Sequence, residues 1–191
     1  MINSGRIGMT DPLMAQLPIL DDNNWKRWFP ECAGSFSDPR VRTVFGDGRD
    51  MVSGLAPGWA DAFFLDLPDP EGQVAGFYCA EFFGTVRGLL AKGGGMALQC
   101  GPLFFRSRRV SAIFADLCRV FPSVSAYLCH VPSYGGECLF AMASESLPVP
   151  SAGRVAGVFS ERGVGGLKRC SPGALAAMFE LPPWARDSLW S

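Results

Sequence analysis

The stretch 62–71, which reads AFFLDLPDPE, constrains the fold of this chain more than any other segment. Its apolar residues end abruptly in two aspartates, Asp66 and Asp69. A short continuous apolar run bounded by polar residues and proline is typical of a strand buried on both faces. Open α/β sheets bind ligands beyond the carboxyl ends of such strands, so the two aspartates are predicted to stand at a ligand site.

The chemistry of this stretch favours a positively charged ligand. Pro68 and Pro70 stiffen the loop, because each fixes its own φ and restricts the residue before it. Two carboxylates on a stiff loop suit a cationic substrate or an acid–base step on an amine. The same spacing also fits a plain strand exit with Asx-type turns, and the residues alone leave both interpretations open.

Composition narrows the class of protein. The chain has 191 residues, 48% of them apolar and only 18% charged, which predicts a packed globular protein. A net charge of −1 gives no basic footprint for nucleic acid, and no apolar stretch is long enough to span a membrane. A single histidine excludes a His-rich zinc site, and no metal is expected. The seven cysteines form no C-x-x-C pair, which indicates reduced thiols and a cytoplasmic location.

Helical and strand patterns alternate along the chain. Strands are expected at residues 41–45, 62–65, 96–100, 125–131 and 138–143, and helices at 50–55, 80–91, 110–120 and 171–179. Gly93, Gly94 and Gly95 are expected to end the second helix, and Pro182 and Pro183 to end the last. This order predicts an α/β domain with a mostly parallel sheet and an antiparallel C-terminal hairpin. Residues 1–147 would form that domain, and 148–191 a loop and a short helix packed on it.

Several short motifs in the right order resemble one enzyme family. The segments are DPRV at 38–41, GDG at 46–48, DLPDP at 66–70, FYCAEFF at 77–83, QCGP at 99–102 and VPSYG at 131–135. Together they resemble the C-terminal half of the spermidine synthases, the polyamine aminopropyltransferases. The resemblance runs from about residue 11 to residue 178. It implies a Rossmann-like, methyltransferase-type fold.

The chain also departs from the family pattern. Family members carry an N-terminal β domain, a first sheet strand and a GGGDG loop, and the chain begins after all three, so the resemblance implies an N-terminally truncated domain. Met9 stands where an acidic residue would bind ribose, and Cys138 stands where an aromatic residue usually follows the VPSY turn.

The resemblance implies transfer of an aminopropyl group from decarboxylated S-adenosylmethionine to putrescine, with no resident cofactor. Asp66 would be the catalytic base, because an ammonium must lose its proton before it can attack. Asp69 would hold the amine, Tyr134 would hydrogen-bond the same group, and Gln99 would contact the acceptor. Tyr134 also fits a packed edge aromatic, and Gln99 a satisfied polar group within a strand.

The co-substrate contacts implied by the resemblance lie earlier in the chain. Asp47 would accept from the adenine amino group, and Gly48 would allow close approach. A plain turn residue is the other interpretation of Asp47.

Two other functions remain open at this point. One is a catalytically inactive, spermidine-synthase-like fragment or paralogue that acts as an assembly partner, because the edge left by the missing strands would favour pairing with another chain. The other is a transferase that uses ordinary S-adenosylmethionine. A small diamine is the expected substrate, and the family suggests a homodimer.

Overall fold

The computed structural model describes residues 34, 38–42, 44, 46–68, 70, 72–168 and 170–190. The chain divides into two compact units, residues 1–55 and 56–191. This division falls at a different place from the predicted one at 147/148, which stays a prediction.

The first unit contains a short helix, α2 (Gly48–Ser53), close to the one expected at 50–55. The strand expected at 41–45 is wrong at its described positions, because residues 41, 42 and 44 adopt neither strand nor helix. The backbone N–H of Val41 instead donates to the carbonyl of Asp38 over 2.8 Å, which closes a turn. An alternating pattern makes a strand only where a neighbouring strand supplies the ladder, and no described residue does so here.

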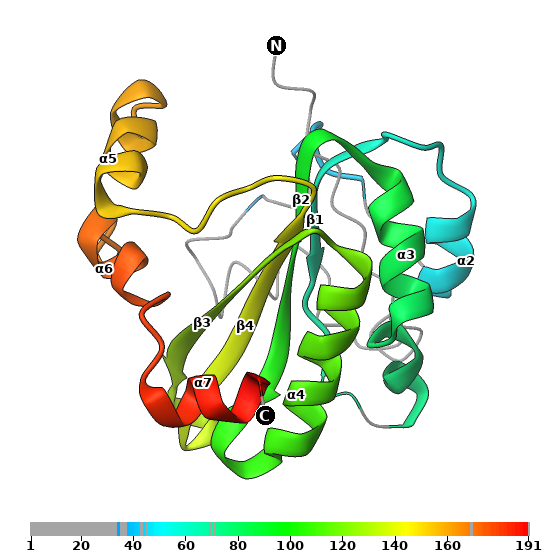
Figure 1. The fold of residues 1–191 in the computed structure, drawn as a ribbon. Helices are drawn as coiled ribbons and strands as arrows, with labels where there is room; N and C mark the ends of the chain where they lie inside the picture. The colour runs from blue at the N-terminus through cyan, green and yellow to red at the C-terminus, as the bar shows by residue number, and fades with distance from the viewer. Residues whose placement is uncertain are drawn as a thin grey trace. The chain divides into compact units, whose positions relative to one another are not determined.

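The second unit is built on a four-stranded sheet with the order β1-β2-β4-β3 (Figure 1). Its strands are β1 (Ala60–Leu65), β2 (Leu90–Pro102), β3 (Ser123–Val131) and β4 (Gly136–Ser144). The β1–β2 pair is parallel, and the β2–β4 and β3–β4 pairs are antiparallel. Strands β1, β2 and β3 therefore end at the same edge of the sheet, and β4 begins there.

This topology confirms an α/β fold with a C-terminal hairpin but corrects the predicted sheet. Among the described strands the sheet is mixed, not mostly parallel, with one parallel pair out of three. The reason is that β4 returns from the hairpin and inserts between β2 and β3, so two strands that run in the same direction are not neighbours.

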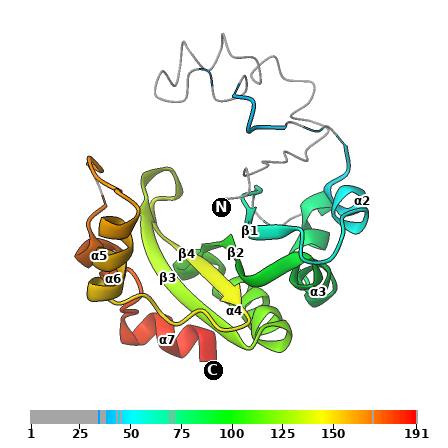
Figure 2. The ribbon, with the colours of Figure 1, turned by 90° about the horizontal axis from the view of Figure 1, so that it is seen from above.

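Helices cover one face of this sheet (Figure 2). A 3₁₀ segment, η5 (Gly72–Phe77), leads into α3 (Ala80–Leu89), and α4 (Leu103–Val120) follows β2, with a kink at Arg106. Both helices repeat apolar residues at a spacing of three or four, which places them on one stripe. The largest fully buried side chains include Phe83, Val86, Met96, Leu103, Val110, Phe114, Leu117 and Leu139. Burial of each such side chain stabilises the fold by about 1.5–3 kcal/mol.

The three consecutive glycines lie in β2 and not at a helix end, which corrects the prediction. A Cβ built on Gly94 would lie 2.9 Å from the carbonyl oxygens of Asp61 and Ala91, so no side chain fits there. Gly93 has a φ of +82°, in the region that favours glycine. The β1–β2 register shifts between Ala60 and Ala62. The glycines therefore allow β2 to begin irregularly against β1.

The C-terminal part holds more helix than predicted. Helix α5 (Ala152–Glu161) lies where a loop was expected at 148–166, and Ser151 caps it by accepting from the backbone N–H of Arg154 over 3.3 Å. Helix α6 (Pro172–Ala177) agrees with the expected one. Helix α7 (Pro183–Trp190) was not predicted, because Pro183 was interpreted as a stop although proline is also favoured in the first turn of a helix.

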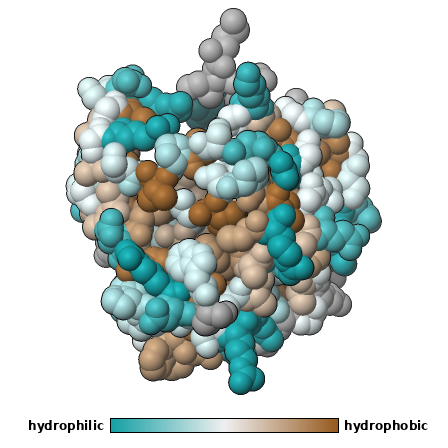
Figure 3. Space-filling view, in the orientation of Figure 1, coloured by the Kyte–Doolittle hydropathy of each residue, from teal (hydrophilic) through white to brown (hydrophobic). Residues whose placement is uncertain are grey.

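Aromatic contacts join α7 to α4. The ring centroids of Trp190 and Phe114 lie 5.4 Å apart, and those of Trp184 and Phe104 lie 6.4 Å apart. Both pairs pack edge to face. Figure 3 shows hydrophobic patches near the centre of the view with hydrophilic residues around them. Scattered exposed apolar side chains of this kind are normal on a globular surface.

Candidate functional site

Asp66 is the first residue after β1, as the sequence predicts. Its side chain is exposed, and it makes no hydrogen bond or ion pair with any residue that the structure describes. A carboxylate in this position keeps its lone pairs available to a ligand or to water. Asp69, the second predicted aspartate, lies outside the described residues.

Gln99 and Tyr134 come together although they are 35 positions apart in the chain. Gln99 lies in β2, and Tyr134 ends the 3₁₀ turn η6 (Pro132–Tyr134) that follows β3. The Gln99 Nε2 group donates a hydrogen bond of 3.0 Å to Tyr134 Oη, and both side chains are half-buried. Among the described residues, the tyrosine hydroxyl hydrogen and the amide oxygen of Gln99 have no further partner, so the pair offers one donor and one acceptor to a ligand.

The sheet register brings Asp66 toward this pair. Leu65 pairs with Leu98 at the end of the parallel ladder, so Asp66 and Gln99 are the next residues along the two neighbouring strands. Tyr134 stands just beyond the end of β3, at the same edge. Three of the predicted site residues therefore lie at the carboxyl edge of one sheet, where α/β folds place ligands.

Aromatic residues pack beside Gln99. Phe140 of β4 is its register partner across the β2–β4 pair and also pairs with Tyr127 of β3. The Phe140 and Tyr127 rings stack with centroids 5.3 Å apart, and Phe179 lies 5.0 Å from Tyr127. Partial burial raises the pKa of the Tyr127 phenol above its ordinary value. The sequence pattern does not predict this stack, since strand alternation shows which residues share a face but not which strands are neighbours.

The predicted co-substrate residues belong to the first unit. Asp47 is the N-cap of α2, and its Oδ1 accepts from the backbone N–H of Arg49 over 2.8 Å. The Arg49 Nε lies 3.7 Å from the same oxygen. Gly48 is buried as the first residue of the helix. The Asp47 carboxylate therefore has a local structural use, as the turn interpretation of this residue anticipated.

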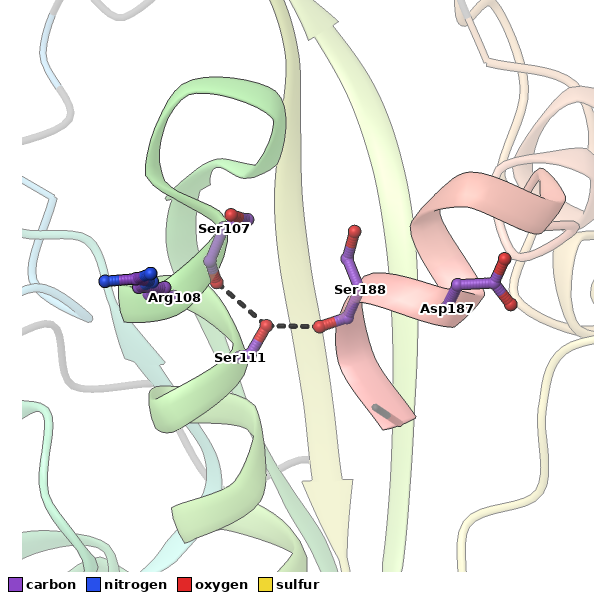
Figure 4. Close-up of a pocket in the computed structure, with 5 residues that line it drawn as sticks. All are labelled: Ser107, Arg108, Ser111, Asp187 and Ser188. Carbon is purple, nitrogen blue, oxygen red and sulfur yellow. Dashed lines mark hydrogen bonds between the residues drawn. The ribbon is translucent and has the colours of Figure 1, made fainter.

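A shallow hollow of about 450 Å³ lies elsewhere, between α4 and α7 (Figure 4). Ser111 Oγ hydrogen-bonds the carbonyl of Ser107 at 2.8 Å and also the carbonyl of Ser188. In Figure 4 the Arg108 and Asp187 side chains point away from each other. The hydroxyl of Ser111 is thus used to join the two helices, and no predicted site residue lines the hollow.

No group of three or more His, Cys, Asp or Glu side chains among the described residues is placed to hold a metal ion. Within the same residues, no helix has the length and apolar character needed to cross a membrane.

Comparison with known proteins now gives the family. Residues 23–151 match the model of the spermine/spermidine synthase domain. The chain belongs to the spermine/spermidine synthase family. Among relatives, it is 34% identical over 167 residues to a polyamine aminopropyltransferase of Nitrosomonas europaea, which covers 86% of this chain and 51% of that protein. A polyamine aminopropyltransferase of Korarchaeum cryptofilum is 32% identical over 167 residues, with 86% and 52% covered. The chain thus spans about half the length of these family members.

Solved structures of family members share the fold. A spermidine synthase in complex with the transition-state analogue AdoDATO superposes with a TM-score of 0.78 at 19% identity, covering 96% of this chain and 60% of that one. The spermidine synthase of Thermotoga maritima gives a TM-score of 0.75 at 19% identity, with 96% and 59% covered. At this identity the likeness establishes the fold alone.

Proposed function

We propose that the chain takes part in polyamine aminopropyl transfer, moving an aminopropyl group from decarboxylated S-adenosylmethionine to a diamine of the putrescine class. The observation that carries the proposal is the Gln99–Tyr134 hydrogen bond at the sheet edge beside Asp66. Family membership and the names of its relatives support the reaction type.

Both reactants are positively charged, and the edge of the sheet carries the negatively charged Asp66. The donor is a sulfonium cation and the acceptor a diammonium at neutral pH, so a nearby carboxylate lowers the free energy of gathering them. The ammonium group of the unbound diamine has a pKa near that of lysine, about 10.4, and must lose a proton to expose the lone pair of its nitrogen. Asp66 accepts that proton in this proposal, while Tyr134 and Gln99 orient the amine. Most of the rate enhancement comes from holding the nitrogen in line with the carbon that it attacks.

The proposal gives roles to three further predicted residues. Asp69 binds the distal ammonium of the diamine, and Asp47 accepts from the adenine amino group with Gly48 beside it. Asp47 has two acceptor oxygens with several lone pairs, so its cap to Arg49 does not use all of its capacity.

A calorimetric titration tests the site directly. Aminopropyl transfer leaves 5′-methylthioadenosine as the by-product, so the purified chain is titrated with that nucleoside in the presence and absence of putrescine. Micromolar binding that tightens with putrescine is expected, and it would be followed by mass detection of spermidine from the two substrates. A folded chain that binds neither molecule would contradict the proposal and favour the assembly-partner function.

One observation favours a second reaction at the same edge. The chain is 34% identical over 110 residues to putrescine N-methyltransferase 3 of Nicotiana tabacum, which covers 57% of this chain and 29% of that protein. A methyl transfer from ordinary S-adenosylmethionine to putrescine would use the same amine-binding residues. Parallel assays with the two donors distinguish the reactions by product mass. One product is putrescine with an added aminopropyl group, and the other is putrescine with an added methyl group.

A further inference from the structure

Two cysteines face each other across the last hairpin. Cys129 of β3 and Cys138 of β4 are register partners in the antiparallel ladder. Residues directly opposite in such a ladder project to the same face of the sheet, because both strands share one pleat. The two thiols therefore point to the same side, at the base of the turn that carries Tyr134.

The spacing of an antiparallel ladder suits a covalent bridge. Directly opposite residues have Cα atoms about 4.5 to 5.5 Å apart. A disulfide accepts Cα separations of about 4.4 to 6.8 Å. Closure of the pair thus needs side-chain rotation and no change of register.

The two thiols differ in exposure, and this difference determines which of them reacts first. Cys129 is half-buried and Cys138 is fully buried, so Cys129 is the more accessible of the two to a reagent in solution. Cys100 of β2 lies close enough to interact electrostatically with Cys138, but complete burial raises the pKa of its own thiol far above the usual range. Cys100 falls in the register shift between Gln99 and Gly101 and has no ladder partner among the described residues of β4, so it is not placed opposite Cys138 as Cys129 is.

We propose that Cys129 and Cys138 form a reversible dithiol–disulfide site for small-molecule disulfides such as glutathione disulfide. The Cys129 thiolate attacks one sulfur of the reagent, its S–S bond breaks, and one glutathione leaves as a thiolate that takes up a proton. The Cys138 thiolate then attacks the Cys129 sulfur and releases the second glutathione. Two cysteine thiols are oxidised, and one glutathione disulfide is reduced to two glutathione molecules.

The bridge would act on the turn that presents Tyr134. The bridge would join β3 to β4 covalently just below η6. Its second cysteine, Cys138, lies four residues after Tyr134 in the chain. Amide hydrogen exchange in residues 130–137 is expected to slow on oxidation, because opening of the hairpin is then restricted.

Peptide mapping of the whole chain tests the proposal. The reduced protein is incubated with glutathione disulfide and digested, without reduction, by trypsin and a glutamate-specific protease. Cleavage after Arg119, Glu137 and Glu145 separates residues 120–137 from 138–145, so only a Cys129–Cys138 bridge joins these two peptides. The joined pair is expected to appear, and dithiothreitol is expected to release it.

Two variants control this experiment. Cys138→Ser should stop the reaction at a glutathione adduct on Cys129, whereas Cys118→Ser should leave the bridge intact, since Cys118 is an exposed thiol on α4. A wild-type chain that retains a glutathione adduct on Cys129 while Cys138 stays a reduced thiol would overturn the proposal. Glutathionylation of Cys118 alone, or a bridge from Cys138 to Cys100, would also overturn it.

Discussion

Two aspartates in similar sequence settings are used in different ways. Asp47 follows an apolar segment in the first unit and caps α2 through the backbone N–H of Arg49. Asp66 follows β1 in the second unit and has no hydrogen-bond or ion-pair partner among the described residues. A carboxylate that caps a helix stabilises its own segment, whereas one without a protein partner at a sheet edge is available to a ligand.

A third aspartate extends the comparison. Asp38 accepts from the backbone N–H of Arg40 at 2.8 Å and from its guanidinium at 2.8 and 2.9 Å. Its carboxylate is therefore paired locally, like that of Asp47. Because Asp38 and Asp47 are paired locally and Asp66 is available to a ligand, mutation of each aspartate is expected to have a different effect.

The largest effect is expected from Asp66→Asn. Loss of a positioned base lowers turnover by about 10²- to 10⁴-fold. The measurement is the rate of spermidine formation in an active preparation. Asp61→Asn, in the exposed first half of β1, is the matched control and should leave the rate within twofold of wild type. Turnover that survives Asp66→Asn unchanged would remove Asp66 from the chemistry.

A smaller effect is expected from Tyr134→Phe. The variant loses the hydroxyl that accepts from Gln99 and that would hydrogen-bond the diamine in the proposed site, and one such hydrogen bond contributes about 1 to 1.5 kcal/mol. Putrescine affinity should therefore fall about tenfold in a calorimetric titration. Tyr127→Phe keeps the stack on Phe140 and serves as the control. Equal affinity in the two variants would show that Tyr134 is only a packed residue.

The positions of several strands and helices in the sheet region could be predicted, because the sequence patterns that indicate them are local and consistent with one another. Apolar runs that end in polar residues located β1 and β3, and the spaced apolar residues of 80–91 located α3. The place of Asp66 follows from the end of its strand, because α/β folds bind ligands at that edge. The roles of Gln99 and Tyr134 come from the family resemblance and stay predictions. The hydrogen bond between Gln99 and Tyr134 could not be predicted, since it depends on β4 entering between β2 and β3.

The failures have equally specific causes. Gly93–Gly95 resembled a helix cap, but close approach of the β1 carbonyls requires glycine there, and this constraint is visible only in three dimensions. The segment that forms α5 contains glycines at 153 and 157, which lower its helix propensity. Tertiary packing of Val155, which is buried, outweighs that preference.

The next prediction separates the two uses of Asp47. Asp47→Ala removes the cap and should destabilise the first unit by about 1 kcal/mol, whereas Asp47→Ser keeps a capping oxygen and should cost only a few tenths. Faster amide exchange at Arg49 in the alanine variant alone would report loss of the cap. If Asp47 also binds adenine, both variants should weaken 5′-methylthioadenosine binding by a similar factor. Unchanged nucleoside binding in the serine variant would assign Asp47 to capping only.

The smallest effect concerns Asp38, whose carboxylate is the most fully paired of the three. Hydrogen bonds from the Arg40 side chain and backbone lower the pKa of Asp38 from its ordinary 3.8 to about 2. Because the folded pKa lies below the unfolded value, the pairing stabilises the folded state above pH 4, and that contribution is lost as the pH falls toward 2. Arg40→Gln should raise the NMR midpoint of the Asp38 carboxyl toward 3.8, whereas Arg42→Gln should not move it. An unchanged midpoint in Arg40→Gln would show that the ion pair does not set the pKa of Asp38. Asp47 would then be the one locally paired carboxylate left to contrast with the available carboxylate of Asp66.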